Sequence, residues 1–238
     1  MGCTMTAALS PIHASLRQAS MVDYPGRLAA VLFTTGCNFR CGFCHNAALL
    51  GTMRPGYSWE RLGELCEDFR RQWVRAVVVT GGEPTLAPAL LETLAFLRER
   101  GFEIKLDTNG SRPAVLAEAL PLVDFVAMDI KCSLPSYPEF VGFDDHGAIR
   151  ESIAVLLASG KPCEFRTTLI EAVHTDAEMQ AIGEAIRGAP VYAVQAFLPH
   201  DDLPDPALRT AARTRPQALR HAAEIVRPMV QRVEIRGD

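Results

Sequence analysis

The sequence predicts an α/β protein that folds as a partial (βα)6 TIM-like barrel, and three observations support this fold class. Six short apolar runs alternate with amphipathic segments of helical period along the 238 residues, which is typical of a parallel sheet covered by helices. Polar residues and glycines follow the carboxyl ends of the apolar runs, where barrels of this kind carry their active sites. Six units are too few for a closed eight-fold barrel, so we expect an open one.

The first half of the chain contributes four predicted strands and three predicted helices. The strands are the apolar runs at residues 28–33, 76–80, 102–106 and 125–128. Ser58 is predicted to cap the first helix, whose apolar stripe is Leu62, Leu65, Cys66, Phe69 and Trp73. A second helix follows Pro88 and ends at Gly101, and a third covers residues 113–120. Cys66 is therefore interpreted as a core residue.

The second half contributes strands at residues 163–169 and 191–198, and residues 233–236 could form a seventh. Thr175 and Glu178 have the spacing of a capping box, which predicts the start of a helix. Further helices are expected before Gly160 and near the C-terminus, where the inward residues would be Leu219, Ala222, Ala223 and Val226.

No linker or repeat divides the chain. We therefore expect a flexible lead-in at residues 1–20 and a single domain at residues 21–238, with an extra C-terminal helix. Residues 132–145, rich in Pro, Tyr and Phe, are expected to form a loop.

Composition excludes several classes of partner. The formal net charge of −4 gives no reason to expect nucleic acid or an anionic membrane as a partner. No apolar run reaches the roughly 20 residues that span a bilayer, and no secretory signal is expected. The N-terminal Met1–Thr6 matches a myristoylation pattern, which we attribute to chance. The predicted location is the cytoplasm.

Three of the seven cysteines are grouped, whereas Cys3, Cys66, Cys132 and Cys163 are scattered singly. Cys37, Cys41 and Cys44 follow a predicted strand directly, which indicates a metal centre in a reducing compartment. Structural zinc normally takes four Cys or His ligands, and His45 is poorly placed to be the fourth. Thiolates hold the irons of iron–sulfur clusters. Three thiolates would thus leave one iron of a four-iron cluster open to a small molecule.

The loop resembles the Cys-x3-Cys-x-aromatic-Cys motif of the radical S-adenosylmethionine (SAM) superfamily, with Phe43 at the aromatic position. The resemblance implies one [4Fe-4S] cluster whose open iron binds SAM. Gly81, Gly82 and Glu83 resemble the Gly-Gly-Glu segment that holds the methionyl amino group in that superfamily. Glycines allow close approach of the backbone to a ligand, and a carboxylate accepts bonds from an ammonium group.

Further motifs resemble the glycyl-radical-enzyme activating enzymes, and most of all the anaerobic ribonucleoside-triphosphate reductase activating protein. These motifs are Asp23-Tyr24-Pro25-Gly26, Cys44-His45-Asn46, Asp107-Thr108-Asn109-Gly110 and Asp129-Ile130-Lys131. The resemblance implies that reduced flavodoxin or ferredoxin donates an electron, that SAM is cleaved, and that a glycyl radical forms on a partner enzyme. It covers about residues 20–198.

The same resemblance assigns roles to individual residues. Asn46, Asp107, Thr108 and Asp129 would lie near SAM, and a monovalent cation would bind at Asp107, Thr108, Asp129 and the carbonyl of Ala127. Lys131 would neutralise a carboxylate or face the target peptide. Arg166 would contact the SAM carboxylate or the substrate, and His200 would contact SAM. Simpler interpretations exist. Asp129 and Lys131 could form an ion pair at the end of a strand, Arg166 could pair with a buried acid, and His200 could lie in a solvated loop. We also expect four other histidines to be exposed to solvent: His13, His146, His174 and His221.

Two other functions stay open at this point. A radical SAM enzyme could act on a small molecule or on another peptide. A zinc-stabilised binding protein without enzymatic activity would use the same cysteines and would be colourless.

Overall fold

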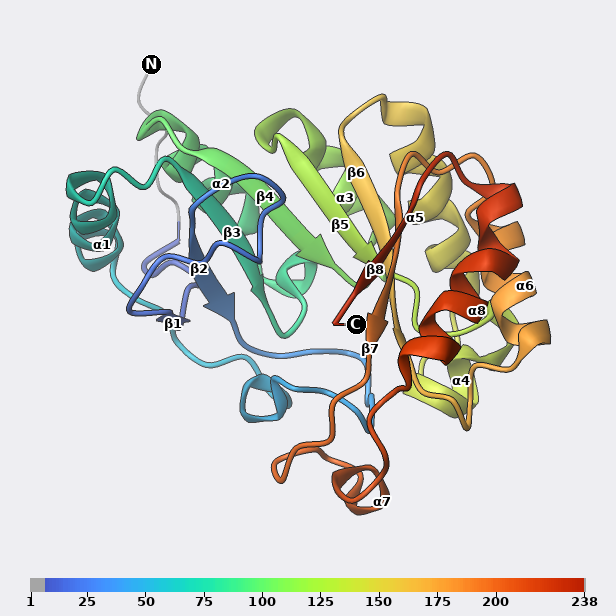
Figure 1. Ribbon diagram of the computed structural model, residues 1–238. Helices are drawn as coiled ribbons and strands as arrows, with labels where there is room; N and C mark the ends of the chain where they lie inside the picture. Colours follow the sequence, from blue (N-terminus) through green and yellow to red (C-terminus); the bar gives the residue numbers. More distant parts are fainter. Residues whose placement is uncertain (1–6, 238) are drawn as a thin grey trace. The chain divides into compact units, whose positions relative to one another are not determined.

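The computed structural model describes residues 7–237 (Figure 1). These residues form two compact units. Unit 1 contains the described residues up to Asn38, together with Ala48–Thr108 and Ala114–Val126. Unit 2 contains Phe39–Ala47, Asn109–Pro113 and the described residues from Ala127 onward. The expectation of a single domain over residues 21–238 stays a prediction. The motif Met1–Thr6, together with Cys3, lies outside the described residues.

Unit 1 is built on a sheet in the order β1-β2-β3-β4. Its strands are β1 Ala14–Ser15, β2 Ala29–Thr34, β3 Ala76–Gly81 and β4 Glu103–Thr108. The helices of this part of the chain are α1 Trp59–Arg71, α2 Leu90–Glu99 and α3 Pro113–Ala119, with short 3-10 turns η1 Ala47–Leu49, η2 Pro84–Leu86 and η3 Leu120–Leu122. β1 is antiparallel to β2, whereas β2, β3 and β4 are parallel.

The register of the parallel strands brings their carboxyl ends to one edge of the sheet. Thr34, the last residue of β2, is paired with Gly81, the last residue of β3. The cysteine loop and the Gly-Gly-Glu segment therefore both begin at this edge. β2 and β3 are almost entirely buried because their runs of Ala, Val, Leu and Phe face apolar neighbours on both sides.

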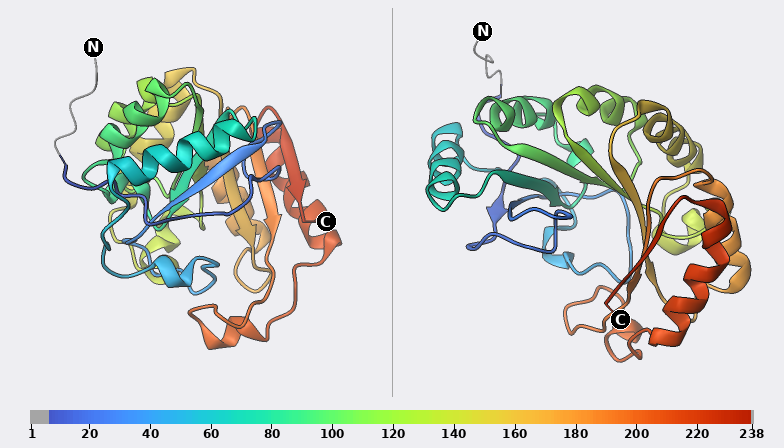
Figure 2. Two further views of the ribbon diagram at one scale, coloured as in Figure 1. Left: turned by 90° about the vertical axis from the view of Figure 1, so that its left-hand side faces the viewer. Right: turned by 45° about the horizontal axis from the view of Figure 1, so that its top comes forward.

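Unit 2 contains β6 Cys163–Leu169, β7 Tyr192–Ala196 and β8 Val233–Arg236, which are parallel in that order. β5 Phe125–Asp129 precedes them in the chain. The helices are α4 Tyr137–Val141, α5 His146–Ser159, α6 Asp176–Ala185, α7 Pro206–Arg209 and α8 Pro216–Val226, with 3-10 turns η4 Leu134–Ser136 and η5 Arg227–Met229. α6 and α8 lie side by side, and α8 packs on β7 and β8 (Figure 2).

Together these elements confirm the α/β fold class with a predominantly parallel sheet. The predicted caps are also present: Ser58 Oγ accepts from Arg61 N at 3.2 Å, and Thr175 Oγ1 accepts from Glu178 N at 3.3 Å. Within residues 7–237 the structure has no helix long and apolar enough to cross a membrane.

Three expectations were wrong in detail. Trp73 is 80% exposed and does not belong to the apolar stripe of α1. It follows the last turn of α1, and its left-handed backbone with φ +62° directs the side chain away from that stripe. Residues 132–145 carry η4 and α4 instead of a plain loop, and Gly142 ends α4 with φ +67°. His174 is buried, with 6% of its surface exposed, and not solvated.

The segment expected to be a lead-in contributes to unit 1 wherever the structure describes it. Ile12 is fully buried, Ser10 N donates to Tyr57 O at 3.0 Å, and β1 pairs with β2. Whether residues 1–20 are flexible stays a prediction.

Candidate active site

The cysteine loop carries three thiols within eight residues. Cys41 is buried, and Cys37 and Cys44 are half-buried. Cys44 N donates to Cys41 O at 3.3 Å, so the second and third cysteines lie on one tight turn. Burial raises the pKa of the Cys44 thiol, whereas a bond from the Asn46 backbone and the charge of Lys131 lower it. The loop therefore offers a partly exposed thiol near a cation, which suits a metal ligand.

The other described cysteines differ from these three. Burial raises the pKa of Cys132 to about 12 and those of Cys66 and Cys163 to about 11. Unlike the three cysteines of the loop, these three are not grouped in the sequence. Cys66 is 3% exposed on the inner side of α1, which confirms its interpretation as a core residue.

The Gly-Gly-Glu segment is bound to the backbone that leads into the cysteine loop. Gly82 N donates to Thr34 O at 3.0 Å, and Glu83 N donates to Gly36 O at 2.8 Å. A Cβ on Gly82 would lie 2.1 Å from Gly36 O, and Gly81 has φ +122°. The two glycines are thus needed for contact between two segments of the chain, a reason that the sequence analysis did not foresee.

Glu83 is buried and its carboxylate is held by uncharged donors. Its Oε1 accepts from Thr85 N at 3.0 Å, Thr85 Oγ1 at 2.5 Å and Thr108 Oγ1 at 2.8 Å. Thr108, predicted to lie near SAM, therefore orients Glu83.

Asp107, another predicted site residue, contacts a lysine that the sequence analysis missed. Lys105 Nζ lies 2.5 Å from Asp107 Oδ1. Both residues belong to β4, two positions apart, so their side chains point to the same side of the strand. The signal that could have found this pair is a lysine inside an otherwise apolar predicted strand.

Asp129, Lys131 and Arg166 form an ion-pair triad in unit 2. Asp129 Oδ2 accepts from Lys131 Nζ at 2.9 Å, and Asp129 Oδ1 accepts from Arg166 Nε at 2.8 Å. Burial alone would raise the pKa of Asp129, but the two cations outweigh burial and hold it below its usual range. Burial would lower the pKa of Lys131, and Asp129 raises it above its usual range. The triad has two positive charges and one negative charge.

An aromatic stack and a buried histidine support this triad. Phe43 of the cysteine loop stacks on Phe140 at 5.3 Å between ring centroids, and Lys131 Nζ lies 5.7 Å from the centre of the Phe43 ring. His174 Nε2 lies 2.9 Å from Lys131 O, and His174 packs edge-on against Phe140. Tyr137 Oη accepts a hydrogen bond from Lys131 N at 3.1 Å. His174 was missed because a single histidine has no periodic signal.

Glu178 makes only one of the two hydrogen bonds of the predicted capping box. Its backbone N–H bonds to Thr175, but its carboxylate accepts from Ser133 N at 2.8 Å and Ser133 Oγ at 2.7 Å. Burial alone would raise the pKa of Glu178, but the hydrogen bonds from Ser133 outweigh burial, so the net shift of the pKa is downward. Glu178 thereby fixes the chain just after Lys131.

The remaining predicted residues lie closer to the surface. His200 is exposed, and its Nδ1 accepts from Asp202 N at 3.2 Å. Asn46 is half-buried, and the neighbouring His45 contacts Leu198 O through Nε2 at 3.1 Å. The roles that the resemblance assigns to His200 and Asn46 stay predictions.

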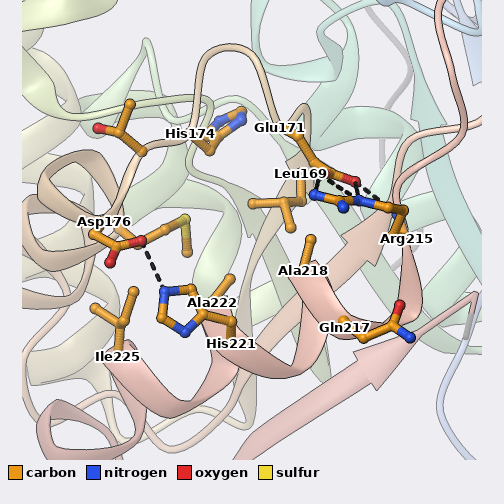
Figure 3. A pocket seen from close by; sticks show the side chains of 12 residues that line it. Leu169, Glu171, His174, Asp176, Arg215, Gln217, Ala218, His221, Ala222 and Ile225 are labelled. Carbon is orange, nitrogen blue, oxygen red and sulfur yellow. Dashed lines mark hydrogen bonds and ion pairs between the residues drawn. The ribbon is translucent and has the colours of Figure 1, made fainter.

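Two pockets in unit 2 differ in their relation to these residues. One, of about 530 Å³, is lined by Gly42 and Phe43 of the cysteine loop and by Phe140. The other, of about 360 Å³, lies between α6 and α8 and contains none of the predicted site residues (Figure 3). Its charged side chains are paired, Arg215 with Glu171 at 2.6 Å and His221 with Asp176 at 2.9 Å.

The donor set of the loop fits an iron–sulfur cluster. It consists of three thiols that share one loop, and Cys44 lies near the charge of Lys131. Among the described residues, no group of three or more His, Cys, Asp or Glu is arranged to hold a single metal ion. The thiol chemistry of the loop, together with its spacing, is what favours the cluster.

Comparison with known proteins gives a consistent result. A profile of the Radical SAM superfamily matches residues 31–184. A protein of Methanocaldococcus jannaschii, named as a glycyl-radical enzyme activating enzyme, is 32% identical over 91% of this chain and 92% of its own length. A pyruvate formate-lyase-activating enzyme of Clostridium pasteurianum is 33% identical over 50% of this chain and 52% of its own.

A solved structure shows the same fold. A radical SAM methyltransferase from Sphaerobacter thermophilus superposes with a TM-score of 0.65 over 90% of this chain and 67% of the other, at 19% identity.

Proposed function

The chain belongs to the radical SAM superfamily, and from this premise we propose that it generates a glycyl radical on anaerobic ribonucleotide reductase. It is an enzyme of the radical SAM oxidoreductase type and a member of the glycyl-radical enzyme activating family. This membership implies a [4Fe-4S] cluster, SAM and a glycyl radical enzyme as partner. Membership in this family also argues against the alternative of a zinc-stabilised binding protein without enzymatic activity.

The strongest support for activation of a protein partner is the likeness to the M. jannaschii protein, which extends over nearly all of both chains. The choice of ribonucleotide reductase rests on the motifs around Asp23, Cys44, Asp107 and Asp129. Flavodoxin or ferredoxin is the proposed electron donor, and the cytoplasm is the proposed location.

In the proposed mechanism, the chain's own residues bind and orient the reactants. Cys37, Cys41 and Cys44 would hold the cluster. When bound, the cluster would supply one electron for reductive cleavage of the sulfonium of SAM, the chemistry from which a glycyl radical on the partner would follow. The protein contributes binding, orientation and exclusion of water.

The two ends of the methionyl group of SAM differ in charge, and the chain offers a group for each. Glu83, oriented by Thr85 and Thr108, would accept hydrogen bonds from the amino group. The triad of Asp129, Lys131 and Arg166, with its excess of one positive charge, would receive the carboxylate. In this proposal Phe43 positions Lys131, while Gly81 and Gly82 position Glu83.

The test is an anaerobic reaction of the reconstituted protein with SAM, a reductant and each glycyl radical enzyme of the source organism in turn. We expect a persistent glycyl radical signal in electron paramagnetic resonance on anaerobic ribonucleotide reductase. Cys41→Ala should give neither this signal nor deoxyadenosine, because a cluster ligand is lost.

Each outcome of this test has a distinct meaning. A radical on a different glycyl radical enzyme would correct the partner alone. Deoxyadenosine formation without a radical on any protein would favour the small-molecule alternative. Deoxyadenosine formation by Cys41→Ala would overturn the assignment of the cluster ligands.

A further inference from the structure

Lys105 is a buried lysine whose charge is bound to a predicted site residue. Its side chain is 1% exposed, and its ammonium lies 2.5 Å from Asp107 Oδ1. In β4 it is paired with Val78 of β3, so it enters the sheet among apolar residues. Lysine is almost never fully buried unless it is paired, and burial of an unpaired charge is very costly. The ammonium is therefore a fixed part of the environment of Asp107.

Asp129 is in a comparable situation in unit 2. Its two carboxylate oxygens contact Lys131 Nζ at 2.9 Å and Arg166 Nε at 2.8 Å. Asp107 and Asp129 are the two carboxylates to which the sequence resemblance assigns a monovalent cation. Each of them contacts one or two cationic side chains of its own unit.

These contacts do not fit a metal cation at the same carboxylates. An alkali ion prefers carboxylate, carbonyl and hydroxyl oxygens. At Asp107 or Asp129 the ion would have to share the carboxylate with an ammonium or a guanidinium group, which carries the same positive charge as the ion. The hydroxyl of Thr108, the third side-chain ligand in the resemblance, donates to Glu83 Oε1 at 2.8 Å. A tethered ammonium supplies the same single positive charge.

We infer that the ammonium of Lys105 replaces the monovalent cation, so that this enzyme binds and cleaves SAM without K⁺ or Na⁺. The inference rests on the proposed function, because it concerns the SAM site of an activating enzyme. The ammonium is held by the chain, so its occupancy does not depend on the salt concentration of the medium.

The first test compares the reconstituted wild-type enzyme in KCl, NaCl and choline chloride at equal ionic strength. SAM affinity from anaerobic calorimetry and the rate of deoxyadenosine formation should each agree within twofold among the three salts. SAM binding at least tenfold weaker in choline chloride would overturn the inference. Failure to cleave SAM in every salt would instead count against the proposed function.

The second test removes the ammonium. Lys105→Met should bind SAM at least tenfold more weakly in choline chloride, and KCl should restore binding and raise the thermal unfolding midpoint. The double variant Lys105→Met/Asp107→Asn is the matched control, since it removes both charges and should show no response to K⁺. A Lys105→Met protein that folds and ignores K⁺ would contradict the inference.

A third measurement gives a result even if Lys105→Met does not fold. Wild-type crystals soaked in RbCl are examined by anomalous scattering, which detects rubidium in place of potassium. A crystal in which Lys105 Nζ contacts Asp107 and no rubidium is bound there supports the replacement of the cation by Lys105. A rubidium ion coordinated by Asp107 refutes it.

Discussion

Two lysine–aspartate pairs with the same spacing end two strands, and they differ in burial. In β4 the order is Lys105-Leu106-Asp107, and at the end of β5 it is Asp129-Ile130-Lys131. Side chains two positions apart share one face of a strand, so the lysine and the aspartate of each pair can contact each other. The side chains of the first pair are 1% and 14% exposed, and those of the second are 18% and 26% exposed.

This difference indicates two separate tasks. The buried pair is closed to solvent on the lysine side, so its ammonium is a fixed charge held by the fold. The partly exposed pair includes a third member, Arg166, and has an excess positive charge that an anionic ligand can use. In the proposed function, the same two residue types thus supply a fixed internal charge in one place and a ligand-binding group in the other.

Breaking the buried pair should give the largest effect on stability. Asp107→Asn leaves the Lys105 ammonium buried without its carboxylate, and removal of one partner from a buried pair costs about 3–5 kcal/mol. We expect this loss in the free energy of unfolding, measured by urea titration at neutral pH. Lys105→Met/Asp107→Asn should recover most of it. A loss below about 1 kcal/mol for Asp107→Asn would show that this pair is not an internal one.

Breaking the partly exposed pair should affect stability less and SAM binding more. Asp129→Asn should lower the free energy of unfolding by only about 1 kcal/mol, as for pairs near solvent. It should weaken SAM binding about tenfold, or about 1.4 kcal/mol, because Lys131 and Arg166 lose the group that orients them. Anaerobic calorimetry measures this change. Asp176→Asn, an exposed residue of α6, is the control, and equal SAM affinities of the two variants would refute a role for Asp129.

The smallest expected effect is the pH dependence caused by His174, whose ring contacts the carbonyl of Lys131. Burial lowers its pKa, despite opposing bonds from Lys131 and Ile170. The unfolded chain then binds a proton near pH 6.5 that the folded protein does not bind. The stability due to neutral His174 is present above about pH 6.5 and is lost as the pH falls below it.

Urea titrations between pH 7.5 and 5.5 should therefore show a decrease in wild-type stability that is smaller in His174→Gln. His221→Gln, a change at an exposed histidine of α8, is the control variant. An unchanged slope in His174→Gln would indicate that this buried ring can be protonated in the folded protein.

Local patterns in the sequence predicted most of the elements correctly. The strand expected at residues 163–169 is β6, and that at 76–80 is β3 with one more residue. Ser58 caps α1 as expected. Such features depend on the hydrophobic period and on hydrogen bonds within one turn, and both can be recognised in a short segment of the chain.

Burial of single residues could not be predicted in the same way. His174 was expected in solvent, and Trp73 in the core, and each lies in the opposite environment. Whether one side chain is buried depends on segments that pack against it from elsewhere in the chain. For His174 these include Phe140 and Lys131, which lie far from it in sequence.

The sequence by itself determined the cysteine spacing, the glycines before Glu83 and the two lysine–aspartate pairs, because each is confined to a few consecutive residues. Only the tertiary structure decided how these groups are used. It brought Arg166 to Asp129 across 37 positions and Thr108 to Glu83 across 25. It also buried Lys105 within the sheet. Charge balance and burial depend on contacts between distant segments, and they decide which carboxylates can bind a ligand and which are already occupied by the chain itself.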